Sequence, residues 1–168
     1  PGAAAMIRPL RVLLLGDTHL GFDLPRRPRV LRRHRGPDFF RMFSMVMETA
    51  LRERVDLVVH GGDVFHRSRV RDDLVLNALD LVRPVTEAGI PVVIVPGNHE
   101  RSVLPLRLLW AMPNLHVFDA PETKTLIVRG VRVALTGFPF HRRDVRASFP
   151  RLVARANGND GTARDADV

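Results

Sequence analysis

Three short apolar runs, each closely followed by a glycine and by side chains that can bind metal ions, constrain this chain most. The runs span residues 12–15, 56–60 and 90–95, and the segments after them read Gly16-Asp17-Thr18-His19, Gly61-Gly62-Asp63 and Gly97-Asn98-His99-Glu100. Runs of this length and character predict strands that are buried on both faces, as parallel strands usually are. Because loops after parallel strands meet at one edge of the sheet, these polar side chains can converge although they are distant in the chain.

Two amphipathic segments separate the three runs. Pro37-Asp38 is typical of a helix start, and apolar residues then recur at helical spacing as far as Leu51. A second helix is predicted over 72–88, with two aspartates at its positive end and Gly89 as its stop. Strand, helix, strand, helix and strand in this order predict an α/β fold with right-handed crossovers and a parallel sheet.

The later part of the chain changes its pattern. A short strand is expected at 115–118, and strands at 124–128 and 131–135 flank Arg129-Gly130, a connection typical of a two-residue hairpin. A short helix is expected at 151–155. An antiparallel section therefore joins the parallel one.

Length and composition set the class of protein. A chain of 168 residues with 45% hydrophobic and 26% charged residues can form one globular domain, which we place at 1–156, before a tail at 157–168 whose composition predicts disorder. Apolar runs stay well short of the roughly 20 residues that span a bilayer, and no secretory signal is visible. We therefore expect a cytoplasmic protein that does not bind membranes.

The absence of cysteine restricts the metal chemistry. Without thiolates, the candidate ligands are Asp, His, Asn and Glu, which suit hard or borderline divalent cations.

The formal net charge of +8 has two explanations. Arginine-rich composition follows from a GC-rich coding sequence whatever the protein does, whereas clustered cations bind nucleic-acid phosphates. One cluster is denser than the rest and lies directly after the first motif: Arg26, Arg27, Arg29, Arg32, Arg33, His34 and Arg35. Its position beside the predicted site favours a functional role.

The residue types at the strand ends suit a pair of metal ions. Asp17 and His19 are two residues apart, so both can reach one ion, and Asp63 can bridge two ions through its two oxygens. Asn98 can ligate a cation through its amide oxygen, and His99 can meet a substrate. Two such ions polarise a phosphoryl group and activate a water. Each motif alone also fits an ordinary turn or helix cap, but three in order favour a metal site.

The same residues carry a family resemblance. The matching segments read Asp-Thr-His-Leu-Gly from residue 17, His-Gly-Gly-Asp-Val-Phe-His-Arg-Ser from residue 60 and Val-Pro-Gly-Asn-His-Glu from residue 95. They resemble the first three motifs of the calcineurin-like metallophosphoesterase superfamily, and the resemblance covers residues 7 to about 150. Leu20-Gly21 and Val64-Phe65-His66 resemble the SbcD-type DNA double-strand-break repair nucleases. Glu100 instead matches the phosphatases. The resemblance implies a sandwich of mixed sheets flanked by helices.

The resemblance also implies roles for individual residues. Asp17, His19 and Asp63 would hold the first metal, Asp63 and Asn98 the second, and His99 would be the substrate-facing acid. The ions are expected to be Mn²⁺, with Mg²⁺, Fe²⁺ and Zn²⁺ as alternatives.

Other residues are assigned less directly. His66 matches a position near the site in the nucleases, with a solvent-facing loop histidine as the alternative, and His60 is expected to be a hydrogen-bonded core residue. His34, His116 and His141 have no supporting motif. The candidate DNA contacts are Arg26, Arg27, Arg32 and Arg33.

The later histidine motifs of the superfamily are missing. A lone His and a Gly-His-x-His segment complete the metal sites in the superfamily, and neither stands in this sequence. We therefore expect a truncated part of a longer DNA exonuclease, which alone binds metal weakly and turns over slowly or not at all. An SMC-like ATPase partner is implied for that parent enzyme. The alternatives are a phosphomonoesterase or cyclic-nucleotide phosphodiesterase, and a non-catalytic DNA-binding fragment.

Overall fold

The computed structural model describes residues 9–27, 29–100, 112–142 and 144–158. The elements follow in the order β1 (Val12–Leu15), α1 (Gly36–Arg52), β2 (Leu57–His60), α2 (Asp72–Glu87), β3 (Val92–Ile94), β4 (Leu115–Val117), β5 (Glu122–Val128), β6 (Val131–Gly137) and α4 (Val145–Gly158). The alternation of strands and helices predicted from the sequence is confirmed.

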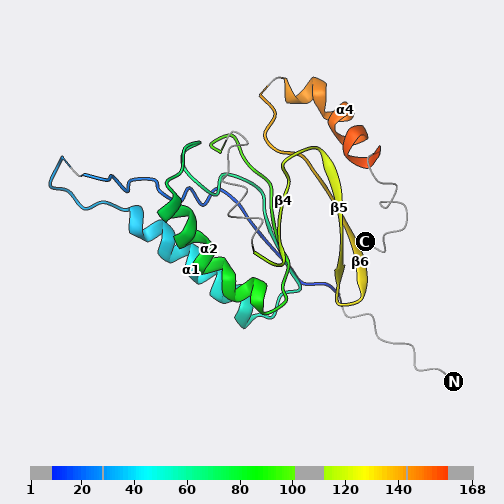
Figure 1. Ribbon diagram of the computed structural model, residues 1–168, viewed down its shortest axis with the longest axis horizontal. Coiled ribbons are helices and arrows are strands. Elements are labelled where there is room, and N and C mark those ends of the chain that lie inside the picture. Colours follow the sequence, from blue (N-terminus) through cyan, green and yellow to red (C-terminus); the bar gives the residue numbers. More distant parts are fainter. Residues whose placement is uncertain (1–8, 28, 101–111, 143, 159–168) are drawn as a thin grey trace.

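The first four strands form a parallel sheet in the order β1-β2-β3-β4. Leu13 aligns with Val58, which in turn aligns with Val92, so the carboxyl ends of three strands stand next to one another. Helices α1 and α2 lie side by side along one face of this sheet (Figure 1). Their apolar stripes, with Phe43 and Val82 at their centre, bury that face and form the main core.

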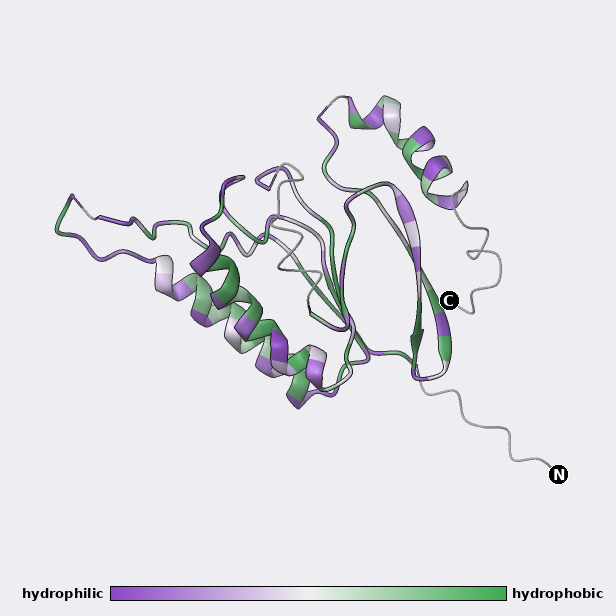
Figure 2. Ribbon diagram, viewed as in Figure 1, coloured by the Kyte–Doolittle hydropathy of each residue, from purple (hydrophilic) through white to green (hydrophobic). Residues whose placement is uncertain are grey.

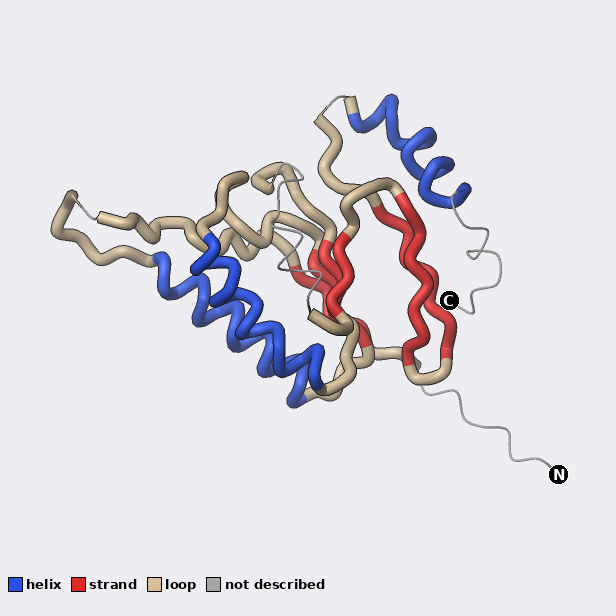
Figure 3. Tube along the Cα trace, viewed as in Figure 1, coloured by secondary structure: helices blue, strands red, loops and turns tan. Residues whose placement is uncertain are grey.

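A hairpin covers part of the opposite face of the sheet. Strands β5 and β6 pair antiparallel, and Arg129 and Gly130 both have positive φ, as the predicted two-residue turn requires. Phe118 and Val93 on the sheet form a second cluster with Leu126 of the hairpin. The expected parallel and antiparallel strands thus occur in two separate sheets (Figure 3).

Helix α4 packs on the outside of the hairpin and is longer than predicted. It begins after Asp144, whose carboxylate accepts the N–H of Ala147 at 3.2 Å, and it continues through Pro150 to Gly158. Pro150 removes one helical hydrogen bond, but Leu152 and Ala156 on this helix are buried. The first two residues of the predicted tail therefore belong to the helix, and residues 159–168 lie outside the described residues.

The surface reflects this layering. The colours of α1 and α2 alternate between hydrophilic and hydrophobic residues along each helix, as expected for helices with one buried side (Figure 2). The hairpin leaves the outer edge of β1 uncovered, so Leu14 is 74% exposed. Among the described residues, no helix combines the length and apolar character that crossing a membrane requires.

Candidate metal centre

The loops after β1 and β2 are joined by backbone hydrogen bonds. Asp17 donates its N–H to the carbonyl of Gly62 at 3.0 Å, and His19 donates to the carbonyl of Asp63 at 2.9 Å. Leu20 and Phe65 then form an isolated parallel bridge. The pairing of β1 with β2 thus continues into the two loops, and it fixes the predicted ligands of one loop against those of the other.

Asp17, His19 and Asp63 come together at this sheet edge. Each offers a ligand atom, and these atoms all lie within 4.8 Å of one another. Asp63 is buried, His19 is half-buried and Asp17 is exposed, so the group faces solvent on one side. Two carboxylates and one imidazole match the donors that Mn²⁺, Fe²⁺ and Zn²⁺ accept, so this set fits a divalent ion.

The backbone at these three residues is strained. Their φ angles are +54°, +43° and +55°, in the left-handed region that residues other than glycine adopt rarely. Such a conformation costs of order 1 kcal/mol per residue and persists where the surrounding structure imposes it. Positive φ also occurs at Asp23, Arg54, Asn114 and Arg129, which lie in turns and loops away from these ligands, so the conformation alone does not mark the site.

Gly97 allows the third loop to approach Asp63. A Cβ on Gly97 would lie 2.1 Å from Asp63 Oδ1, so no other residue fits there without displacing the carboxylate. The N–H of His99 donates to the same Oδ1 at 3.0 Å. Asn98 lies between these two residues and is exposed in the turn, and its role as a ligand of the second ion stays a prediction.

His66 lies with His19 and His99 rather than alone in solvent. Their ring centroids are 5.4 Å and 5.0 Å from that of His66, and His19 and His99 are 4.6 Å apart. Burial, together with these two neighbours, lowers the pKa of His66 and favours the neutral imidazole. His66 is thus half-buried between two other rings rather than fully exposed, and its role at the site stays a prediction.

His99 has one ring nitrogen held by the backbone. Its Nδ1–H donates to the carbonyl of His66 at 2.8 Å, which leaves Nε2 as the free nitrogen. A fixed ring with one free nitrogen is what a proton donor or a metal ligand needs.

His60 is confirmed as a hydrogen-bonded core residue. It is 2% exposed; its Nε2 lies 2.9 Å from Thr18 Oγ1, and its Nδ1 accepts the N–H of Gly62 at 3.2 Å. Because Thr18 donates its own proton to the carbonyl of Val64, we assign the proton of the imidazole to Nε2. Burial lowers the pKa of His60 to about 4, so the ring is neutral near pH 7.

Glu100 belongs to the third motif, but sequence reasoning missed the backbone groups that it binds. Its carboxylate is fully buried, and Oε1 accepts the N–H of Phe65 at 2.7 Å. Oε2 accepts the N–H groups of Gly97 at 2.7 Å and Asp63 at 3.2 Å. Burial raises the pKa of this carboxyl, and the backbone hydrogen bonds oppose that shift. Glu100 therefore ties the second loop to the third, through partners that no sequence pattern marks.

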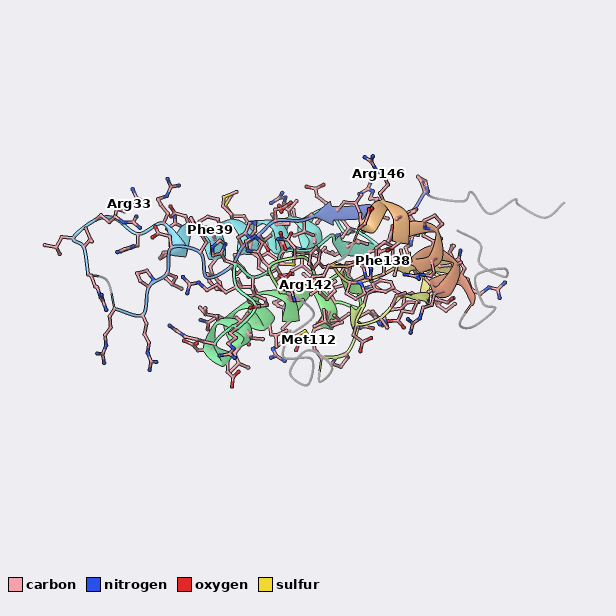
Figure 4. All side chains as sticks on the ribbon, turned by 90° about the horizontal axis from the view of Figure 1, so that it is seen from above. Arg33, Phe39, Met112, Phe138, Arg142 and Arg146 are labelled. Atoms are coloured by element: carbon pink, nitrogen blue, oxygen red, sulfur yellow. The ribbon has the colours of Figure 1, made fainter. Side chains whose placement is uncertain are left out.

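The arginine-rich segment forms an arm that projects from the fold between β1 and α1. Asp23 closes its base, because its carboxylate binds the Arg32 guanidinium at 2.6 Å, the His34 ring at 3.0 Å and the Arg35 N–H at 2.8 Å. The Arg35 amide, the His34 ring and the Arg32 guanidinium hold the pKa of Asp23 well below its usual range. Arg33 lies toward the far end of the arm (Figure 4).

The four arginines proposed as DNA contacts differ in their pairing. Arg32 is in an ion pair with Asp23. Arg26, Arg27 and Arg33 are exposed and have no ion-pair partner among the described residues. An open cavity of about 890 Å³ runs along the arm to His66, and the loop after β2 contributes Arg67, Arg69 and Arg71 to its wall.

The three histidines without a supporting motif lie outside the candidate metal site. His34 is bound to Asp23, while His116 lies in β4, where burial lowers its pKa. His141 is half-buried after β6. They do not belong to the two groups of candidate metal ligands found among the described residues.

Comparison with known proteins identifies relatives of this arrangement. The chain is 42% identical over 113 residues to the DNA double-strand break repair protein Mre11 of Aeropyrum pernix, covering 66% of this chain and 26% of that protein. It is 41% identical over 92 residues to Mre11 of Halobacterium salinarum, covering 54% and 22%. The chain thus spans about a quarter of the length of these relatives.

A solved structure and a family model extend the comparison. A dimetal phosphatase from Danio rerio is 25% identical, with 61% of this chain and 33% of that chain covered and a TM-score of 0.41. The model of the family described as calcineurin-like phosphoesterase matches residues 10–154, which is most of the chain. This chain therefore belongs to the calcineurin-like phosphoesterase family.

Proposed function

We propose that this chain carries the first half of the active site of a metal-dependent phosphodiester hydrolase that acts on DNA ends. The observation that carries the proposal is the convergence of Asp17, His19 and Asp63 at one sheet edge, beside an arginine-rich arm in which some arginines have no ion-pair partner among the described residues. The similarity to Mre11 proteins, whose names describe DNA double-strand break repair, supports DNA as the substrate.

The ligand side chains have distinct tasks. Asp17, His19 and Asp63 would hold one divalent ion, and Asp63 and Asn98 would hold a second. When bound, the ions supply Lewis-acid polarisation of the phosphoryl group. The paired loops keep the two carboxylates and the imidazole in place, so little reorganisation is needed on binding.

His99 acts on the leaving group. Its Nδ1–H is committed to the His66 carbonyl, so Nε2 is the nitrogen that can hold or transfer a proton. The N–H of His99 is bound to Asp63, which links the position of this ring to a metal ligand. His66 lies between the ring of His99 and the arginine-lined cavity and would contact the phosphodiester.

The arm supplies the sequence-independent affinity for DNA. Arg26, Arg27 and Arg33 are exposed and form no ion pair with a carboxylate among the described residues, so they can bind phosphates and release counterions. Arg32 has a different task, because its pairing with Asp23 shapes the arm. The SMC-like ATPase partner, the cytoplasmic location and the identity of the ions stay predictions.

DNA binding is tested on the full chain by measuring duplex affinity against salt concentration. Replacing Arg26, Arg27 and Arg33 together by Ala should lower the slope of log affinity against log salt by about 2 to 3. The matched control replaces Arg146, Arg151 and Arg155 of α4, which are likewise exposed and without an ion pair among the described residues, so the same charge is removed elsewhere. Equal effects of the two triple variants would refute a specific role of the arm.

Catalysis is tested by substrate profiling with Mn²⁺. We expect slow or no hydrolysis by the isolated chain, with any activity on DNA phosphodiesters lost in Asp63→Ala. Preference for a small phosphomonoester or a cyclic nucleotide would replace the nuclease proposal by the phosphatase alternative. Rapid hydrolysis of DNA that depends on Asp63 would show that the described half of the site suffices.

A further inference from the structure

A second group of metal-binding side chains shares His19 with the carboxylate site. His19, His66 and His99 each offer a ligand nitrogen, and these atoms all lie within 4.8 Å of one another. The three rings come from the loops after β1, β2 and β3, so the same sheet edge that gathers the carboxylates also gathers the imidazoles. All three are half-buried.

The nitrogens of this group are available for a ligand. Nδ1 of His19 and Nδ1 of His66 are both buried and have no hydrogen-bond partner in the described part of the chain. Buried polar atoms without partners are rare in folded proteins and call for an explanation. In His99 the nitrogen available for a ligand is Nε2, because Nδ1–H donates a hydrogen bond to the His66 carbonyl. A ring held by the backbone through one nitrogen is the usual state of a metal-binding histidine.

The dimensions suit a small tetrahedral ion. Zinc binds imidazole nitrogen at about 2.0–2.1 Å, which places two such nitrogens about 3.4 Å apart in a tetrahedron. The three rings therefore need to close by at most about 1.4 Å, which side-chain rotations can provide. Phe22 packs against His66 with ring centroids 4.6 Å apart and forms an apolar wall beside the group.

We infer that His19, His66 and His99 form a three-imidazole site for Zn²⁺ or Co²⁺, and that it competes with the carboxylate site for His19. Imidazole ligands suit zinc and cobalt, whereas a set with two carboxylates suits manganese. His19 would bind this ion through Nδ1, which leaves the ring proton on Nε2, the nitrogen 3.7 Å from Asp17 Oδ1. The same neutral ring cannot then ligate an ion among the carboxylates. Zinc bound there therefore opposes manganese binding at the carboxylate site.

Metal titration of the full chain tests this inference without measuring hydrolysis. Co²⁺ is followed by the visible absorbance of its tetrahedral complexes, Zn²⁺ by displacement of Co²⁺, and Mn²⁺ by its paramagnetic resonance signal. His66→Gln should weaken Co²⁺ and Zn²⁺ binding by at least about tenfold and leave Mn²⁺ affinity unchanged. Asp17→Asn should do the reverse, and His19→Gln should weaken all three.

The same metal titrations, made on a control variant, show whether the loss of any histidine weakens metal binding. His116→Gln removes a histidine from β4 that lies outside the group and should leave every affinity unchanged. Far-UV circular dichroism shows whether each variant is folded. Zinc affinity that survives His66→Gln, or that falls equally in Asp17→Asn, would place zinc among the carboxylates and refute the inference. Absence of nuclease activity bears only on the proposed function.

Discussion

Replacement of Glu100 by Gln should weaken both the fold and the metal site, because one carboxylate serves three backbone N–H groups. Gln keeps one acceptor oxygen, and its best orientation turns that oxygen toward Gly97 and Asp63. Its amide group then faces the N–H of Phe65, so one charge-assisted hydrogen bond is lost and two buried donors oppose each other.

The size of the effect follows from these contacts. Loss of a hydrogen bond to a charged group costs about 1.5–3 kcal/mol, and an unsatisfied buried donor adds about 1–3 kcal/mol. Removal of the buried charge offsets part of this, since burial raises the pKa of Glu100 and disfavours its ionised form. We therefore expect a net loss of about 2–3 kcal/mol in the free energy of unfolding.

Urea unfolding at pH 7, followed by far-UV circular dichroism, measures this loss. With an m value of about 2 kcal/mol/M, the midpoint should fall by about 1 to 1.5 M. The matched control is Glu53→Gln, an exposed carboxylate paired with Arg52, which should change stability by less than about 0.5 kcal/mol. Mn²⁺ affinity should also fall in Glu100→Gln, because Asp63 loses one of its supports.

An unchanged or higher midpoint for Glu100→Gln would refute the reasoning. It would mean that Glu100 is protonated in the folded chain and that the three N–H groups do not depend on a charged acceptor. Glu100→Asp keeps the carboxylate but shortens the side chain by one methylene group. Comparison with Glu100→Gln therefore distinguishes the effect of the charge from the effect of side-chain length.

Three further predictions concern other parts of the molecule. The pKa of His60 is about 4 in the fold against 6.5 for a free side chain, so the unfolded state takes up the proton first as the pH falls. Stability present at pH 7 should therefore drop by about 3 kcal/mol toward pH 4, and urea unfolding of His60→Gln should lack this part of the drop. Gly97→Ala places a Cβ against Asp63 Oδ1 and should lower both Mn²⁺ affinity and the urea midpoint, whereas Gly158→Ala, where a Cβ meets no atom within 4 Å, should leave both unchanged. Asp23→Ala should release the arm and speed tryptic cleavage at its arginines, with Asp80→Ala as the control in an exposed helix pair; equal cleavage rates would contradict the role of Asp23.

Much of this protein follows from its sequence alone. Apolar runs that alternate with amphipathic segments predict a parallel sheet covered by helices, and the preference for right-handed crossovers then limits its topology. The convergence of Asp17, His19 and Asp63 follows in turn, since the ends of neighbouring parallel strands must meet. Gly130 favours the hairpin turn through its tolerance of positive φ, whereas Arg129 has no such preference and takes its positive φ from the pairing of the flanking strands.

Tertiary structure decided the features that depend on distant partners. Glu100 binds backbone groups as many as 37 residues away, and His66 joins His19 and His99 only because three loops meet. Asp23 forms an ion pair with Arg32, and amino-acid composition cannot predict which arginine of the arm is paired. A sequence pattern records the preferences of neighbouring residues, whereas these contacts are set by how the loops pack. The sequence therefore predicts where the site forms, and the packing determines which side chains hold it in place.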